Sequence, residues 1–161
     1  MTDYESGAFL QMADRDSLRS AERSTTLTTG ARILVAEDDE DIQALLKKTL
    51  EREGHVVIQA FAGSGLRRAL ELDLDHESEK PDLIVLDLAL PDADGRDLLS
   101  SLKRNPKTAM IPVIVWSGRD ANSDRLVTLT LGAEDYVEKG PPESLVRKID
   151  RILFRLRESK L

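Results

Sequence analysis

Short runs of consecutive apolar residues alternate along this chain with longer segments in which apolar residues recur at helical spacing. An uninterrupted apolar run bounded by turn residues is typical of a strand that is buried on both faces, as in a parallel sheet. The predicted strands are residues 33–36, 56–58, 83–86 and 111–116, with a short strand centred on Tyr136 and Val137. The predicted helices are residues 40–53, 64–74, 96–104, 123–131 and 142–156. This alternation predicts an α/β fold, a doubly wound five-stranded parallel sheet with helices on both faces.

The helix predicted at residues 40–53 has one apolar face. Its apolar residues predict the face that packs on the sheet, and Gly54 provides a stop signal after it. The residues expected on that inward face are Ile42, Leu45, Leu46 and Leu50.

The first 30 residues differ from the rest of the chain. Residues 24–30 are polar and low in complexity, which predicts a linker or an irregular lead-in. Phe9, Met12 and Ala13 could form one face of a short helix within residues 8–23. That pattern is brief, so we favour a mobile or loosely docked N-terminal extension over residues 1–30.

Composition excludes several classes of function. The net charge of −7 argues against nucleic-acid binding through the bulk electrostatic field, which needs a basic face. The chain has no cysteine, so a disulfide framework, a thiolate zinc site and a cysteine nucleophile are excluded. It contains no apolar stretch of the roughly 20 residues that span a membrane, and its acidic start does not resemble a signal peptide. We therefore expect a cytoplasmic protein that binds neither membrane nor nucleic acid.

Polar groups follow four of the five predicted strands. Because parallel strands end at the same edge of a sheet, groups that follow strands 1, 3, 4 and 5 converge if those strands are neighbours. These groups are the acidic residues Glu37, Asp38 and Asp39, then Asp87, Ser117 and Lys139.

Each of these residues also has a simpler explanation. Asp38 and Asp39 precede a helix, where an anion gains about 0.3–1 kcal/mol from the helix dipole. Ser117 could belong to a plain turn, and Lys139 could be an ordinary solvated lysine. Asp87 is harder to explain in this way, because nothing local requires a carboxylate between two leucines.

Clustered carboxylates require a cation, because like charges a few ångströms apart repel by roughly 1–4 kcal/mol per pair. Oxygen ligands without His or Cys favour a hard ion, Mg²⁺ or alternatively Mn²⁺. A metal ion, a lysine and a hydroxyl around an aspartate are suited to phosphoryl transfer, in which the carboxylate attacks.

Four segments resemble, in order and spacing, the receiver domain of two-component response regulators. They read RILVAEDDEDIQALL, PDLIVLDLALPDADG, IPVIVWSGRD and GAEDYVEKG. The resemblance implies a flavodoxin-like topology with strand order 2-1-3-4-5 and a receiver domain over residues 31–158. Residues 159–161 then form only a C-terminal end, so we expect a stand-alone receiver without an output domain.

The resemblance also implies roles for individual residues. Asp87 matches the phosphoacceptor aspartate, Ser117 the switch hydroxyl and Lys139 the lysine that accompanies them. Tyr136 falls on the aromatic switch position, although an aromatic residue in an edge strand is usually only packing. The implied Mg²⁺ ligands are Asp38 directly, Glu37 through water, Asp87, and the backbone carbonyl of Ala89.

By this resemblance the chain is a signalling phosphoacceptor rather than an enzyme. It would take a phosphoryl group from a histidine kinase or a histidine phosphotransfer protein. The phosphorylated form would signal to another protein through the face made by helix 123–131, the Tyr136 strand and the last helix. We expect a monomer or a weak homodimer.

Two features depart from the family pattern. Proline commonly follows the family's lysine directly, in a cis peptide, whereas here Gly140 intervenes before Pro141. The charged stretch at residues 75–80 adds length to a loop away from the strand ends.

Two other functions are compatible with parts of the pattern. A receiver-like interaction module that does not turn over phosphate would share the fold, but it would not need the full set of polar residues. A phosphatase of the haloacid dehalogenase type needs a second aspartate two residues after its nucleophile, and this chain has Ala89 there.

Overall fold

The computed structural model describes residues 30–73, 80–118 and 121–161, and residues 31–161 form one compact unit. The predicted N-terminal extension, apart from Gly30, and most of the charged loop at 75–80 lie outside the described residues. The described helices include none that is both long enough and apolar enough to cross a membrane.

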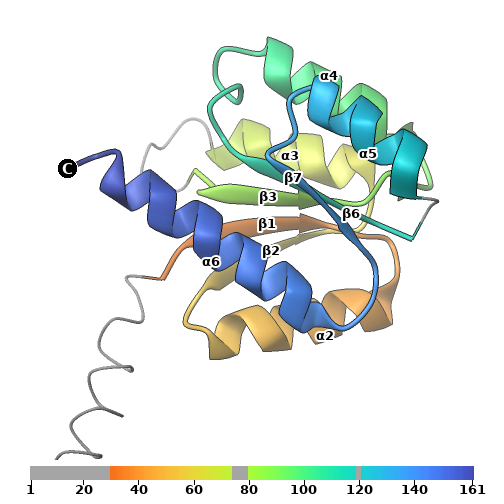
Figure 1. The fold of residues 1–161 in the computed structure, drawn as a ribbon. Coiled ribbons are helices and arrows are strands. Elements are labelled where there is room, and N and C mark those ends of the chain that lie inside the picture. The colour runs from red at the N-terminus through yellow and green to blue at the C-terminus, as the bar shows by residue number, and fades with distance from the viewer. Residues whose placement is uncertain (1–29, 74–79, 119–120) are drawn as a thin grey trace, which may run out of the picture. The chain divides into compact units, whose positions relative to one another are not determined.

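Five parallel strands form the central sheet, in the order β2-β1-β3-β6-β7. This order confirms the flavodoxin-like topology predicted from the sequence. The strands are β1 (Arg32–Ala36), β2 (Val56–Ala60), β3 (Leu83–Leu86), β6 (Val113–Ser117) and β7 (Asp135–Glu138). Figure 1 shows them side by side in the middle of the molecule, with helices on both faces.

The helices are α2 (Glu40–Arg52), α3 (Gly63–Asp73), α4 (Gly95–Arg104), α5 (Ala121–Thr130) and α6 (Pro142–Glu158). Each confirms a predicted helix, with ends that differ by two residues or fewer. The predicted strand at 111–116 is shifted, because Pro112 has no N–H for a ladder and Ile111 donates to Thr108 instead.

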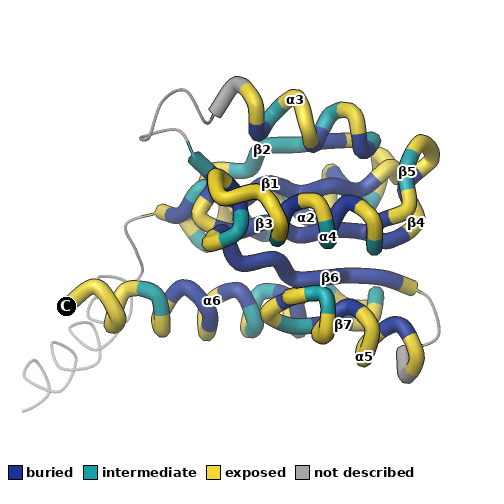
Figure 2. Tube along the Cα trace, turned by 90° about the horizontal axis from the view of Figure 1, so that it is seen from above, coloured by how far each residue is buried: buried dark blue, intermediate teal, exposed yellow. Residues whose placement is uncertain are grey.

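Alternate residues of β1 divide the core into two layers. Leu34 belongs to the layer under α3 and α4, whereas Ile33 and Val35 belong to the layer under α2 and α6. Figure 2 shows β1, β3 and β6 as mostly buried and β2 as mostly half-buried. The helix residues that fill the layers are Leu66, Leu70, Leu98, Leu99 and Leu102 on one face, and Leu46, Leu50, Leu145, Ile149, Ile152 and Leu153 on the other.

The inward face of α2 differs from the prediction at one position. Leu45, expected to pack on the sheet, is 47% exposed, whereas the polar Gln43 is fully buried. Gln43, Leu46 and Leu50 follow one another at intervals of three and four residues, so they form the stripe that faces the sheet.

A two-stranded hairpin, not predicted from the sequence, follows β3. It consists of β4 (Ala89–Leu90) and β5 (Ala93–Asp94), which pair antiparallel. Gly95 closes it against the backbone of Leu88, and a Cβ at position 95 would collide with that backbone. The hairpin therefore requires glycine at this position.

His55 lies at the opposite edge of the sheet, where β1 begins. Its Nδ1 accepts a hydrogen bond from the backbone N–H of Ala31 at 3.2 Å, and its Nε2 lies 3.8 Å from a carboxylate oxygen of Asp150. Burial lowers the pKa of His55, while the charges of Asp150 and Glu53 oppose this and that of Arg157 reinforces it. The unfolded chain therefore binds a proton at His55 more readily than the folded chain does.

The lowered pKa predicts that His55 reduces stability in mild acid. As the pH falls through about 6.5, the unfolded state gains a proton first, so the free energy of unfolding decreases toward the folded pKa. His55→Gln keeps a hydrogen-bond acceptor but does not titrate. Urea unfolding at about pH 7.5 and about pH 5.5 should show a larger loss for the wild type than for this variant. Equal losses in the two proteins would contradict the assignment.

Candidate functional site

The carboxyl ends of four strands bring four predicted site residues, Glu37, Asp87, Ser117 and Lys139, to the same edge of the sheet. The N–H of Asp87 donates to the carbonyl of Ala36, one residue before Glu37, at 3.0 Å. The N–H of Lys139 donates to the carbonyl of Ser117, also at 3.0 Å. These backbone bonds extend the ladders β1–β3 and β6–β7 by one residue each. Polar side chains from four strands therefore emerge at one edge, as the topology predicted.

Lys139 connects the two acidic strand ends. Its Nζ lies 2.7 Å from Glu37 Oε2 and donates to Asp87 Oδ2 at 2.9 Å. Glu37 is 1% exposed and Asp87 is 3% exposed, so both carboxylates depend on this ammonium for compensation. Lys139 also lies 5.8 Å from the centre of the Trp116 ring, within the range of a cation–π contact.

Burial and charge shift the pKa values of this cluster. Burial raises the pKa of Glu37 above its ordinary value, although Lys139 opposes this. Burial alone would lower the pKa of Lys139, but its contacts with Glu37 and Asp87 outweigh that effect and raise it. The lysine is therefore held fully protonated between the two carboxylates.

A third carboxylate completes a candidate metal site. Oxygen atoms of Glu37, Asp38 and Asp87 all lie within 4.8 Å of one another. The single positive charge of Lys139 compensates only one of these three negative charges. A divalent cation would neutralise the remaining negative charge. A cluster of carboxylate oxygens fits a hard ion such as Mg²⁺ or Mn²⁺.

The neighbouring Asp39 caps a helix and is not one of the three clustered carboxylates. Its carboxylate accepts from the N–H groups of Asp41 and Ile42 at 2.9 and 3.0 Å, which makes it the N-cap of α2. Asp38, by contrast, is exposed and belongs to the carboxylate cluster. The simpler explanation offered for both aspartates therefore applies to Asp39.

The other predicted site residues lie around this cluster. Ser117 is the last residue of β6 and is 1% exposed, and Tyr136 in β7 is 4% exposed and packs in the core layer under α3 and α4. Ala89 begins the hairpin, and its N–H donates to Asp87 Oδ1 at 3.1 Å. The peptide between Lys139 and Gly140 is trans, as are all peptide bonds of the described residues.

Asp92, at the tip of the hairpin, was not singled out from the sequence. Its carboxylate accepts from the N–H groups of Gly63 and Ser64 at 2.6 and 2.9 Å, and so caps α3 from a distant part of the chain. These hydrogen bonds lower the pKa of Asp92. No local pattern indicates the contact, because 28 residues separate Asp92 from Ser64.

The chain is similar to known proteins over most of the described unit. Residues 33–150 match the family model of the response regulator receiver domain. The chain is 38% identical over 126 residues to the alkaline phosphatase synthesis transcriptional regulatory protein PhoP of Bacillus subtilis (strain 168), a match that covers 77% of this chain and 49% of PhoP. It spans about half the length of the curated relatives it matches.

Solved structures that are similar to this chain are also response regulators or their receiver domains. The receiver domain of the Francisella response regulator 1452 has a TM-score of 0.68 and 29% identity, and the match covers 79% of this chain and 99% of that one. The Mn²⁺-bound form of the response regulator Rcp1 has a TM-score of 0.61 and 30% identity, with 69% of this chain and 82% of that one covered.

Proposed function

Since this chain belongs to the family of response regulator receiver domains, we propose that Asp87 is its phosphoacceptor. The observation that carries the proposal is the position of Asp87, buried at a strand end within one carboxylate cluster and 2.9 Å from Lys139. The donor would be a phosphohistidine of a histidine kinase or of a phosphotransfer protein. A carboxylate oxygen of Asp87 attacks the phosphorus, the bond from phosphorus to histidine nitrogen breaks, and an acyl phosphate forms.

Asp38 and Asp87 would hold the metal ion directly, together with the Ala89 carbonyl, while Glu37 would act through water. Mg²⁺ bound there would neutralise charge on the phosphoryl oxygens. Lys139 would offer its ammonium to a phosphoryl oxygen and thereby exchange a carboxylate contact for a phosphate contact. The excess negative charge of the cluster supports this assignment, and the Mn²⁺-bound form of Rcp1 supports Mn²⁺ as an alternative ion.

We further propose that phosphorylation switches a protein-binding face. Ser117 would donate its hydroxyl to the phosphoryl group, and Tyr136 would move with it, so that the α5–β7–α6 face changes its affinity for a partner. The backbone bond from Lys139 to Ser117 supports this coupling, because both residues adjoin the same ladder. Exposed apolar side chains on α5 and α6 support a protein partner, namely Leu126, Val127, Leu129 and Phe154.

The proposed function also implies how the chain is divided into a receiver domain and an extension. Residues 31–158 would be the receiver and residues 1–30 an extension, with signalling through protein contacts rather than DNA. A cytoplasmic location and a monomeric or weakly dimeric state stay predictions. The alternative function is an interaction module with the receiver fold that does not turn over phosphate.

Acetyl phosphate distinguishes these two functions. With Mg²⁺ present, we expect the full chain to gain the mass of a single phosphoryl group, and we expect EDTA to suppress this gain. Intact-mass spectrometry measures both quantities directly. An unchanged mass under conditions in which Mg²⁺ demonstrably binds would favour the interaction module.

A further inference from the structure

A fully buried amide lies directly beneath the acidic residues of the site. Gln43, in the first turns of α2, has an exposed fraction of 0%. Its Nε2 donates to the backbone carbonyls of Val35 and Ala60, each at 2.9 Å, and of Glu37 at 3.1 Å. Its Oε1 accepts from Gln59 Nε2 at 3.4 Å. Gln43 therefore reaches back from the helix and binds the ends of two strands.

These carbonyls surround the backbone that presents the metal-binding carboxylates. The N–H of Glu37 donates to the carbonyl of Ala60 at 3.0 Å, and Gln43 contacts both that carbonyl and the carbonyl of Glu37. The N–H of Glu37 is thus bound directly to the end of β2, and its carbonyl is bound to the Gln43 side chain, which also contacts the end of β2. Asp38 follows immediately, so its departure from the sheet is fixed by the same contacts.

The residue type matters at this position. An amide is costly to bury, by about 1–3 kcal/mol on the scale of protein mutations, unless its polar atoms are hydrogen-bonded. An apolar side chain would fill the same space on the inward stripe of α2 but would leave these carbonyls without the Nε2 donor. The location of the amide therefore matches a function in orienting the strand ends.

We propose that Gln43 is a positioning residue for the metal site, holding the Glu37–Asp38 backbone so that both carboxylates face Asp87. This inference rests on the proposed function. Gln43 does not touch the metal ion or the phosphoryl group, and it acts only through the backbone that it binds. Groups that orient metal ligands in this way typically change metal affinity about 10–100-fold when removed.

The test compares Mg²⁺ affinity in variants of the full chain. Gln43→Met keeps the length of the side chain and removes its hydrogen bonds, and it should raise the Kd for Mg²⁺ about tenfold or more. Leu50→Ala, on the same face of α2 but at its far end, should lower stability while leaving Kd unchanged. Isothermal titration with Mg²⁺ alone gives Kd, and circular dichroism establishes that each variant is folded during the titration. Amide hydrogen exchange at Glu37 in the metal-free protein should accelerate in Gln43→Met and not in Leu50→Ala.

The outcomes separate this inference from the proposed function. If the wild type does not bind Mg²⁺, the proposed metal site is wrong. If the wild type binds and Gln43→Met binds equally well, or if Leu50→Ala weakens binding as much, the positioning role is overturned and the metal site stands. Should Gln43→Met fail to fold, Gln43→Asn decides, because its shorter side chain cannot reach all three carbonyls. An unchanged Kd for Gln43→Asn would also overturn the inference.

Discussion

Asp87→Asn should abolish the gain of a phosphoryl group from acetyl phosphate. The amide has no negative charge and is a poor nucleophile, although it has nearly the size of the carboxylate. It also removes one of two buried negative charges beside Lys139, which keeps its contact with Glu37 at 2.7 Å. The fold should therefore be retained, and its stability should change by about 1 kcal/mol or less.

The matched control for this variant is Asp94→Asn. Asp94 lies at the end of the hairpin that follows Asp87, and it caps α4 through the N–H of Arg96, a contact that asparagine also makes well. Intact-mass spectrometry should show full labelling of the control and none of Asp87→Asn. Labelling of Asp87→Asn at the wild-type level would show that another residue is the phosphoacceptor.

Lys139→Ala should separate metal binding from the conformational switch. Without the ammonium, Glu37 and Asp87 stay buried with no compensating charge, so the metal-free fold should lose about 3–5 kcal/mol. Mg²⁺ can still bind the carboxylates, and it should restore part of this loss because it binds only the folded state. Urea unfolding with and without Mg²⁺ measures both effects.

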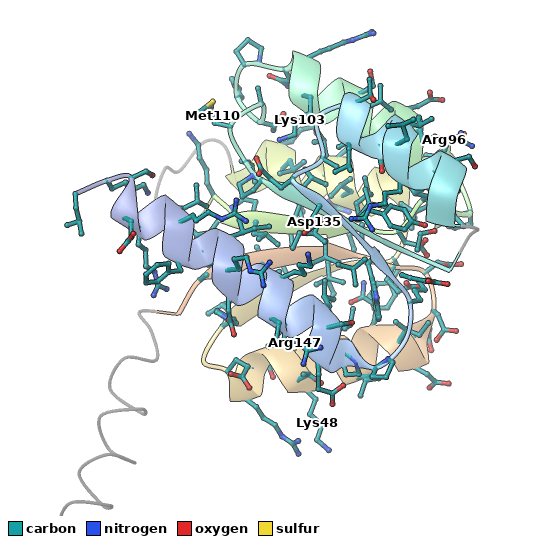
Figure 3. The ribbon with its side chains drawn as sticks, viewed as in Figure 1. Lys48, Arg96, Lys103, Met110, Asp135 and Arg147 are labelled. Atoms are coloured by element: carbon teal, nitrogen blue, oxygen red, sulfur yellow. The ribbon has the colours of Figure 1, made fainter. Side chains whose placement is uncertain are left out.

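A second ion pair provides the control. Lys148 contacts Asp135, labelled in Figure 3, at 2.8 Å near the surface. Lys148→Ala should cost about 1 kcal/mol or less, and Mg²⁺ should not restore it. Trp116 fluorescence tests the switch, since beryllofluoride with Mg²⁺ should change the emission of the wild type but not of Lys139→Ala. A beryllofluoride response retained in Lys139→Ala would contradict the role of the lysine.

The sequence predicted those parts of the fold that depend on uninterrupted or periodic apolar residues. Strand β3 is apolar at every position and buried at every position, so its place in the sheet centre could be read directly. The convergence of Glu37, Asp87 and Lys139 followed from the same topology, because the ends of parallel strands share one edge.

The contacts that the sequence did not predict depend on tertiary structure. Strands β4 and β5 have two residues each, too few for any period to show. The hydrophobicity of Leu45 predicts an inward position, yet the stripe that meets the sheet includes Gln43 instead. A glutamine gives no apolar signal, although its spacing of three from Leu46 and seven from Leu50 could have indicated a buried position.

The cap that Asp92 provides for α3 makes two distant segments depend on one side chain. The hairpin tip and the first turn of the helix can separate only if the bonds to Gly63 and Ser64 break together. Local opening of the chain should therefore not expose the hairpin and the start of α3 one after the other. We expect them to open as a single cooperative unit, so that the segment beside Asp87 opens only as often as a helix on the face of the sheet does.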